Sequence, residues 1–343
     1  MKKLLNTLYV TTQGTYLARK GLTVDVRVEK KTKVRIPIHT LAGVVCFGRV
    51  AMSPALMELC GLRNVGVSFL SERGRFFGRV QGPVSGNVLL RREQYRRADD
   101  LEATLRIGRA VVTAKIANSR TVLQRGLRDH GEKIPVPPVN DALDRMGAGL
   151  ARVGTLDALD AVRGIEGETS RAYFGVFDHL IVAQKDHFSF RDRNRRPPLD
   201  RVNALLSFLY TVLSHDVSSA LQAVGLDPAV GFLHRDRSGR ASLALDLMEE
   251  LRAVMVDRLV LSLINRQQIR GKGFVVTESG AVLMDDGTRK EVLAAYQKRK
   301  QEELTHPFLD EKIPLGLLPH VQALLLSRHL RGDLDGYPPF IWK

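Results

Sequence analysis

Hydrophobic and polar residues alternate over much of 7–80. In 23–29 valine occupies every second position between polar or charged residues. A period of two predicts strands of a sheet with one buried face. Ser53-Pro54 offers an N-cap followed by a first-turn proline, so we expect a short helix that ends near Gly61. The expected strands cover 23–29, 33–38, 65–70 and 75–80, after a first strand near the N-terminus.

After 82–86, which is rich in glycine, the hydrophobic period becomes helical. Apolar residues recur at helical spacing among many arginines up to Leu123, and 135–138, which holds three prolines, breaks the pattern. Further helices are expected over 141–163, 166–183, 199–224, 242–269, 289–303 and 315–331. The pattern predicts an α+β fold, with a small β-rich domain at 1–82, a linker at 83–87 and a larger all-α domain at 88–343.

Composition adds a strong positive charge to this picture. The chain has 52 Lys and Arg against 37 Asp and Glu, a formal net charge of +15. Such an excess favours a polyanionic partner. The only cysteines, Cys46 and Cys60, lie among apolar residues, which predicts buried thiols in a reducing cytoplasm and neither a disulfide framework nor a zinc site. The apolar stretch 205–213 is too short to span a bilayer, so no membrane segment is expected.

The first candidate for chemistry is a carboxylate between two glycines. Glu166 stands in Arg163-Gly-Ile-Glu166-Gly167, near the predicted start of a helix. Glycine weakens a helix, so this setting is unusual for stability alone. The ordinary alternative is a first-turn acid that opposes the helix macrodipole, and the residues alone favour it.

The second candidate joins a histidine to two acids. Asp246 and Glu249 are three residues apart and share a face of a predicted helix, and a turn about Gly239 can bring His234 back beside them. One imidazole with carboxylates suits a divalent cation, Mg²⁺ or Mn²⁺, that activates a phosphodiester. A core histidine with ordinary hydrogen bonds is the alternative, and both interpretations stay open.

The third candidate is an arginine-rich run at 190–198. It carries four arginines and follows Lys185, with only Asp186 and Asp192 to balance them. Arginines next to an aromatic residue, here Phe190, suit a surface that clamps phosphates, although a charge run is usually a solvated loop.

Four motifs in order resemble those of a known family, the spacer integrase called CRISPR-associated protein one. They are Gly164-Ile-Glu166-Gly167; Asn194-Arg-Arg-Pro-Pro198 with Asp200 and 203–208; Gly225-Leu-Asp-Pro to His234; and Asp246-Leu-Met-Glu249. The resemblance covers the whole chain in domain plan, and the tail, 313–320 and 331–340, is similar to the type I-C branch.

The resemblance implies roles for particular residues. The family's metal ligands fall on Glu166, His234 and Glu249, which would also be the catalytic residues. Asp246 matches a neighbouring acid that supports the ligands or occasionally binds the ion. The implied DNA contacts are Arg193, Arg195, Arg196 and Arg252.

The resemblance also implies an activity. It is that of a Mg²⁺- or Mn²⁺-dependent DNA endonuclease and integrase of the prokaryotic cytoplasm, in which the 3′-hydroxyl of a captured duplex attacks the border of a CRISPR repeat. The implied assembly is a homodimer, formed through the β-rich domain, together with the small partner CRISPR-associated protein two. Two rival functions share these residues: a general metal-dependent DNA repair nuclease and a non-catalytic DNA-binding scaffold.

Overall fold

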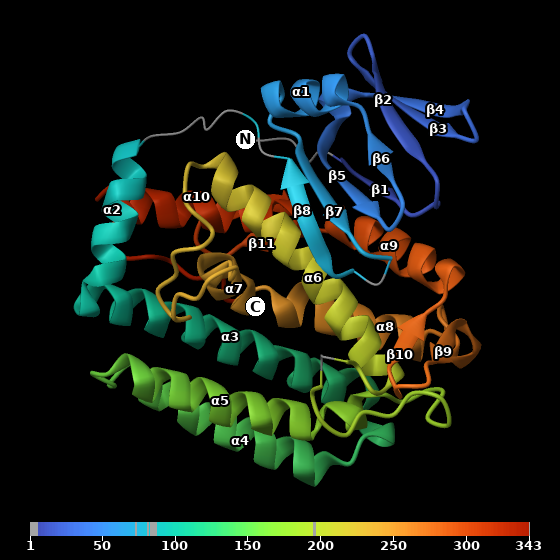
Figure 1. The fold of residues 1–343 in the computed structure, drawn as a ribbon. Coiled ribbons are helices and arrows are strands. Elements are labelled where there is room, and N and C mark those ends of the chain that lie inside the picture. The colour runs from blue at the N-terminus through green and yellow to red at the C-terminus, as the bar shows by residue number, and fades with distance from the viewer. Residues whose placement is uncertain (1–5, 73, 81, 83–87, 195–196, 343) are drawn as a thin grey trace. The chain divides into compact units, whose positions relative to one another are not determined.

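The chain folds into two compact units in the computed structural model (Figure 1), which describes residues 6–72, 74–80, 82, 88–194 and 197–342. Unit 1 comprises Met1–Ser85 with Asp286–Gln301, and unit 2 comprises Gly86–Asp285 with Glu302–Lys343. The predicted linker, 83–87, lies outside the described residues.

Unit 1 is built on two four-stranded sheets within its described part. One sheet has the order β1 (Asn6–Val10), β5 (Leu41–Phe47), β7 (Gly66–Leu70), β8 (Phe76–Val80), and the other has the order β4 (Lys31–Pro37), β3 (Thr23–Val28), β2 (Tyr16–Lys20), β6 (Ala51–Met52). The alternation of the sequence therefore predicted β3, β4, β7 and β8 and a first strand near the N-terminus correctly, but it did not single out β2, β5 and β6. The predicted helix is α1 (Pro54–Leu62), capped by the Ser53 hydroxyl, which accepts the Leu56 N–H.

The core of unit 1 forms between the sheets and α1. Val24, Val44 and Leu56 are fully buried there together with both cysteines. Burial raises the pKa of Cys46 to about 12 and that of Cys60 to about 11. Both side chains therefore stay protonated and behave as small apolar residues, as expected from their neighbours.

One helix corrects the predicted domain division. The helix predicted over 289–303 was expected in the second domain, but α9 (Asp286–Lys300) belongs to unit 1. Gln297 donates a hydrogen bond of 2.7 Å to the carbonyl oxygen of Thr7, and Arg289 donates to the carbonyl oxygen of Glu72. A hydrophobic pattern shows which face of a helix is buried but not which element covers it.

Unit 2 is mainly helical. Its helices are α2 (Val88–Asp99), α3 (Leu101–His130), α4 (Val136–Val153), α5 (Leu159–Gly175), α6 (Arg201–Ala223), α7 (Ser242–Glu249), α8 (Arg258–Asn265) and α10 (Leu318–Leu330), with a π-helical turn, η4 (Arg252–Asp257), between α7 and α8. Figure 1 shows α3, α4 and α5 side by side, and all three pack against one another.

Two predictions for unit 2 were wrong in detail. The domain is not all-α, because it contains the hairpins β9 (Phe274–Val276) with β10 (Val282–Met284) and β11 (Glu303–His306) with β12 (Glu311–Pro314). Such short strands show no clear period of two. The helix break predicted between 163 and 166 is absent, because α5 runs continuously through both glycines beside Glu166.

The apolar helix α6 is a core element. By length and composition alone it could cross a membrane, but 61% of its most apolar window is buried inside the protein. Its N-terminus is capped by Asp200, whose Oδ1 accepts the N–H of Asn203 at 2.7 Å. Burial of this kind is typical of a helix at the centre of a globular unit.

Candidate active site

Glu166 lies in the middle of α5, beyond the first turn of the helix. The first-turn acid of α5 is Asp160, so opposition to the macrodipole does not account for Glu166. Apart from the adjacent residues and the nearby backbone of α5 itself, no atom lies within 4 Å of a Cβ built at Gly164 or Gly167. The space at the two glycines is therefore open, but neither position shares the helix face of Glu166.

His234 follows a loop that Asp246 holds in place from α7. The buried Asp246 carboxylate accepts the backbone N–H groups of Phe232, Leu233 and His234 at 2.6, 2.9 and 2.9 Å. A Cβ at Gly231 would lie 2.8 Å from Asp246 Oδ2. The glycine at this position is thus what allows the loop to approach the carboxylate so closely.

The same carboxylate orients the His234 ring. Nδ1 of His234 lies 2.6 Å from Oδ1 of Asp246. Because the carboxylate accepts hydrogen bonds from its other neighbours too, Nδ1 is the donor, and in the neutral ring Nε2 carries the free lone pair. Nε2 faces Glu249, whose Oε1 is 3.8 Å away. A carboxylate that fixes a histidine in this way is typical of histidine metal ligands.

Glu249 is the last residue of α7, and its side chain is only 3% exposed. Oε1 lies 2.9 Å from NH1 of Arg252, and Oε2 lies 2.8 Å from Nζ of Lys115. Burial raises the pKa of the carboxyl, but the charges of Arg252, Lys115 and His234 more than offset this and lower it to about 2. Glu249 is therefore an anion at neutral pH.

Lys115, which was not among the predicted site residues, joins the site from the middle of α3. Its ammonium contacts Oε1 of Glu166 as well as Oε2 of Glu249, and the Ser170 hydroxyl also donates to Oε1 of Glu166. Burial lowers the pKa of Lys115, but the two carboxylates raise it above its ordinary value. The signal in the sequence was a single lysine inside the apolar run 110–118, which is rare unless the charge is paired.

The structure thus brings the three predicted ligands to one place, from α5, the loop before α7 and the end of α7. Their side chains are not yet close enough to coordinate one ion. Among the residues described, no three His, Cys, Asp or Glu side chains form a group that could hold a metal. Glu166 is linked to Glu249 through the Lys115 ammonium. The buried Oε2 of Glu249 makes no hydrogen bond of good geometry, so it is an acceptor that a cation can use.

The chemistry of these donors fits a divalent ion. Two carboxylates and one neutral imidazole suit Mg²⁺ or Mn²⁺ and leave coordination positions for water or phosphate oxygens. Both carboxylates already contact one cation, the Lys115 ammonium.

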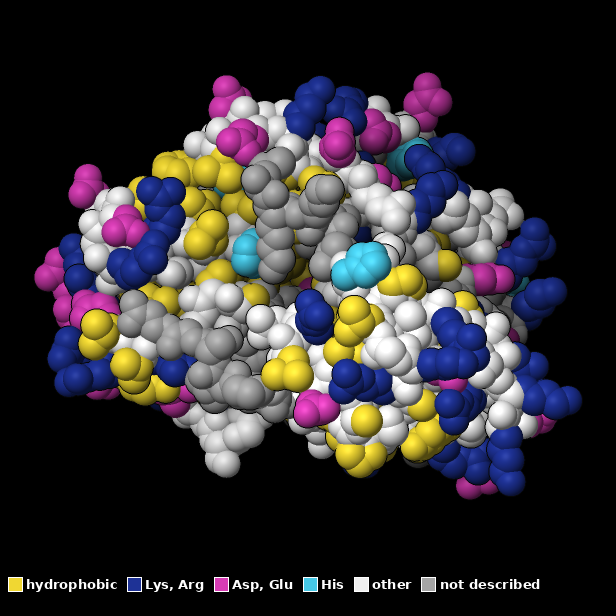
Figure 2. Space-filling model, turned by 90° about the horizontal axis from the view of Figure 1, so that it is seen from above, with side chains coloured by type: hydrophobic (Ala, Val, Ile, Leu, Met, Phe, Trp, Pro, Cys, Tyr) yellow, Lys and Arg dark blue, Asp and Glu magenta, His cyan; other side chains and the backbone are white. Residues whose placement is uncertain are grey.

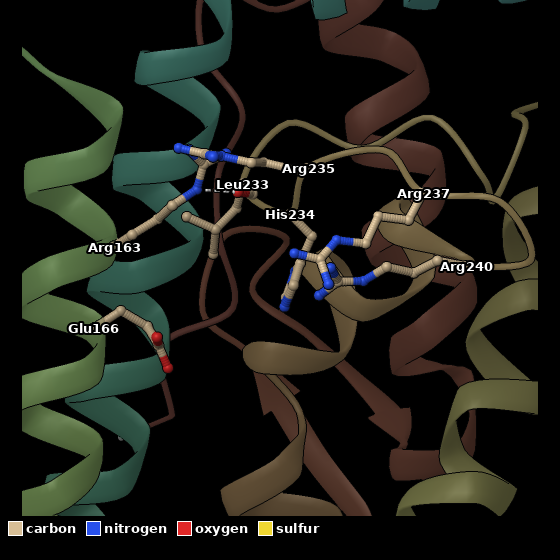
Figure 3. Close-up of a pocket in the computed structure, with 7 residues that line it drawn as sticks. All are labelled: Arg163, Glu166, Leu233, His234, Arg235, Arg237 and Arg240. Atoms are coloured by element: carbon tan, nitrogen blue, oxygen red, sulfur yellow. Dashed lines mark hydrogen bonds between the residues drawn. The ribbon is translucent and has the colours of Figure 1, made fainter.

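Arginines line a pocket of about 250 Å³ beside Glu166 and His234. Figure 3 shows Arg163 reaching from α5 and the side chains of Arg237 and Arg240 extending toward His234. Arg163 donates to the carbonyl oxygen of Leu233 at 2.7 Å, which ties α5 to the His234 loop. The other lining residues are Leu233 and Arg235, and NH2 of Arg235 lies 3.0 Å from both oxygens of Asp160. The turn 235–240 therefore places cations next to the candidate ligands.

The predicted DNA contacts have partners inside unit 2. Arg193 donates to Oδ1 of Asn203 at 2.7 Å, and its guanidinium lies 5.3 Å from the Tyr210 ring centre; Arg252 lies 5.2 Å from the same ring. Arg195 and Arg196 lie outside the described residues. The role of these arginines in DNA binding stays a prediction. On the face drawn in Figure 2, Lys and Arg side chains are interspersed with Asp and Glu.

A second buried acid follows Glu249. Glu250 accepts hydrogen bonds from Tyr337 OH at 2.7 Å and from the Phe340 N–H at 2.8 Å, which anchors the C-terminal segment. Burial raises its pKa to about 8 in spite of these hydrogen bonds. Asn118, one turn beyond Lys115 on α3, donates to the carbonyl oxygens of Glu250 and Phe340. One turn of α3 therefore contacts both residues of the Glu249–Glu250 pair.

Comparison with known protein families gives a clear match. Residues 8–298 match the family described as CRISPR associated protein Cas1. The chain is 53% identical over 343 residues to CRISPR-associated endonuclease Cas1 1 of Chlorobaculum tepidum, and 54% identical over 347 residues to CRISPR-associated endonuclease Cas1 2 of Rhodospirillum rubrum. Both alignments cover 100% of each protein. These names carry no subtype, so type I-C stays a prediction.

Solved structures share the fold. A CAS1 protein from Thermotoga maritima superposes with a TM-score of 0.81 at 24% identity over 96% of this chain and 97% of that one. A casposase bound to integration product superposes with a TM-score of 0.84 at 21% identity, over 99% of this chain and 95% of the casposase chain. A Cas6-RT-Cas1–Cas2 complex gives 0.82 at 22% identity over 100% of this chain and 36% of the longer one. The α+β plan is therefore confirmed, and the chain belongs to the CRISPR-associated protein Cas1 family.

Proposed function

We propose that the protein is a metal-dependent DNA endonuclease and integrase that inserts short foreign DNA fragments into a CRISPR array. The observation that carries this proposal is the His234 ring, held by Asp246 with Nε2 toward Glu249, while Lys115 joins Glu249 to Glu166. Relatives that match the whole chain are named endonucleases, and a casposase bound to integration product has the same fold, which supports a DNA strand-transfer chemistry.

Glu166, His234 and Glu249 would hold one Mg²⁺ or Mn²⁺ ion. Such an ion, when bound, supplies positive charge to the attacked phosphate and its leaving oxygen. Asp246 keeps the imidazole in the tautomer whose Nε2 can donate its lone pair. Glu249 needs no deprotonation step at neutral pH, because its pKa is about 2.

The reaction is a transesterification. The 3′-hydroxyl of the captured fragment attacks a phosphorus atom at the repeat border, a new phosphorus–oxygen bond forms, and the bond to the existing 3′ oxygen breaks. The proton of the attacking hydroxyl leaves to solvent, and one is returned to the leaving oxygen, so nothing is consumed. When water attacks instead, the same site cleaves the strand.

The arginine-lined pocket would bind DNA phosphates next to the reacting centre. Arg237 and Arg240 lie on the same turn and line the pocket with His234. Guanidinium groups bind phosphate through paired, charge-assisted hydrogen bonds. We therefore expect these residues to contribute to binding of duplex DNA without reading its sequence.

The proposed assembly is a homodimer that binds double-stranded DNA together with CRISPR-associated protein two. Its support is the fold shared with the Cas6-RT-Cas1–Cas2 complex. The partner would help place a captured fragment and a CRISPR repeat on one enzyme, because integration requires two DNA molecules whereas cleavage requires one.

The test uses a labelled duplex with free 3′-hydroxyl ends and a supercoiled plasmid that carries the repeat, with and without the partner and with Mg²⁺ or Mn²⁺. We expect labelled duplex to be joined to the plasmid, and a duplex with 3′-dideoxy ends to give no joined product. Nicking without joining under every condition would instead indicate a general repair nuclease.

Two variants separate catalysis from scaffolding. Glu166→Gln and His234→Ala should abolish both joining and nicking while duplex binding persists, and that binding should weaken steeply with salt. Undiminished joining by both variants would contradict the metal-site assignment. If the wild-type protein binds duplex but never cuts or joins it, the chain is a DNA-binding scaffold.

A further inference from the structure

The Lys115 ammonium lies between the two candidate carboxylate ligands. Nζ is 2.8 Å from Oε2 of Glu249 and also contacts Oε1 of Glu166. The Lys115 side chain is 14% exposed, so solvent screens these contacts only weakly. The two acids belong to separate helices, α5 and α7, and Lys115 comes from a third, α3.

Each cation near the site has a different set of contacts. Arg252 pairs with Oε1 of Glu249, whereas Lys115 pairs with Oε2 of the same carboxylate. Among the ion pairs of the described residues, Lys115 forms the one that joins Glu166 to Glu249. Without the Lys115 charge, the negative charges of Glu166 and Glu249 would be less well balanced, and their repulsion would oppose the packing of α5 and α7 against α3.

The contact to Glu249 is electrostatic more than directional. Oε2 of Glu249 receives no hydrogen bond of good geometry, although Nζ of Lys115 is 2.8 Å away. An ion pair without an aligned hydrogen bond is easier to exchange for another cation than a fully bonded one. A divalent ion bound through Oε2 of Glu249 or Oε1 of Glu166 would compete with Lys115 for that oxygen. Oε1 of Glu249 already pairs with Arg252.

We propose that Lys115 is a positioning residue of the metal centre, a tethered cation that holds the Glu166 and Glu249 carboxylates together and competes with the divalent ion for their oxygens. The proposal rests on the metal site of the proposed function. Lys115 would then lower the affinity of the site for the metal. The ion has to displace the Lys115 ammonium, which the fold keeps at a high local concentration beside the two carboxylates.

Calorimetric titration with Mn²⁺ at fixed pH tests this competition. Lys115→Met and Lys115→Gln should each bind Mn²⁺ about tenfold or more tightly than the wild-type protein, because a nearby positive charge has been removed. Lys115→Arg keeps the charge and should stay within a few-fold of wild type. Lys133→Met, which removes an exposed lysine just beyond the end of the same helix, should leave the affinity unchanged.

Thermal unfolding provides a second readout that does not depend on activity. Without added metal, Lys115→Met and Lys115→Gln should unfold at a lower temperature than wild type, because Glu166 and Glu249 have lost a shared counter-ion. Added Mn²⁺ should raise the unfolding temperature of both variants more than that of wild type. Lys115→Gln keeps a hydrogen-bond donor, so it provides a folded variant if the methionine is not tolerated.

The outcomes distinguish this inference from the proposed function. If wild type binds Mn²⁺ and Glu166→Gln abolishes that binding, the metal site stands; equal or weaker binding by folded Lys115→Met and Lys115→Gln would then overturn the role of Lys115 alone. If Glu166→Gln binds Mn²⁺ as wild type does, the metal site itself is wrong, and the competition falls with it.

Discussion

His234 donates a hydrogen bond of 2.6 Å from Nδ1 to the carboxylate of Asp246. The same carboxylate accepts three consecutive backbone N–H groups, those of Phe232, Leu233 and His234. Because its oxygens are engaged in these bonds, Asp246 is placed to orient the imidazole rather than to bind the ion itself. The alternative of occasional ligation by Asp246 is therefore the less favoured of the two predicted roles.

Asp246→Asn should weaken Mn²⁺ binding by about 10–100-fold, because the amide presents a donor where the loop and the ring require an acceptor. Calorimetric titration measures the effect. Asp178→Asn is the matched control, since Asp178 also accepts a backbone N–H, that of Phe190, at 2.7 Å. Unchanged Mn²⁺ affinity in Asp246→Asn would show that the ring needs no such support.

Arg237→Ala should weaken duplex binding by a similar factor for every DNA sequence. If its side chain contacts one phosphate, the slope of log binding constant against log salt concentration should fall by about 0.9. Binding measured over a range of salt concentrations gives this slope. Arg145→Ala removes an exposed arginine that pairs with Asp141 on α4 and should leave the slope as in wild type. If Arg237→Ala and Arg145→Ala have the same salt dependence of duplex binding, Arg237 does not contact a DNA phosphate.

Asn118→Ala should loosen the C-terminal segment. Asn118 is fully buried and accepts the Trp342 N–H at 2.7 Å, in addition to its two bonds to carbonyl oxygens. Its loss should lower the free energy of unfolding by at least about 2 kcal/mol, because buried groups lose their partners. Trp342 is the single tryptophan and packs 3.7 Å from the Arg125 guanidinium, so quenching of its fluorescence reports the release.

Asn140→Ala, at an exposed position of α4, is the control for Asn118→Ala. It should change neither the stability nor the access of a quencher to Trp342. Equal quenching in Asn118→Ala and wild type would contradict the anchoring role.

Asp257 should make the stability of the protein depend on pH. Burial raises the pKa of this carboxyl from 3.8 to about 6, although Tyr210 and Tyr173 donate hydrogen bonds to it at 2.6 and 3.0 Å. Between pH 3.8 and about 6, Asp257 is more often protonated in the folded chain than in the unfolded chain. The protonated carboxyl therefore contributes fully to the free energy of unfolding below pH 4, and this contribution is lost as the pH rises through 6. The loss amounts to about 3 kcal/mol.

Urea unfolding of wild type and Asp257→Asn between pH 4.5 and 7.5 checks this dependence. The stability of wild type relative to the variant should fall as the pH rises, and the difference should become constant above about pH 7. Parallel profiles for the two proteins would show that Asp257 does not titrate in this range.

Much of the fold follows from local patterns. The sequence of β3 has a clear period of two, and α1 has a serine cap followed by proline. The π-helical turn Arg252–Asp257 has no comparable signal, because its residues continue the apolar pattern of a single helix over 242–269. Whether such a turn forms depends on tertiary packing. In this turn Arg252 pairs with Glu249.

The site was predictable where motifs recur and not where a tertiary contact creates it. Glu166, His234 and Glu249 stand in motifs that a known family shares. Lys115 stands in an apolar stretch of α3, which indicates a buried and paired charge, but only the packing of α3 shows which acids are its partners. The turn 235–240 likewise resembled an ordinary polar turn until its arginines were seen to line the pocket.

The most direct test of the metal centre is the anomalous scattering of Mn²⁺ in crystals of the protein. The account predicts a peak about 2.0–2.3 Å from Nε2 of His234 and from a carboxylate oxygen of each of Glu166 and Glu249, with the Lys115 ammonium moved away from it. A peak held by other residues, or none at this position at saturating Mn²⁺, would contradict the account.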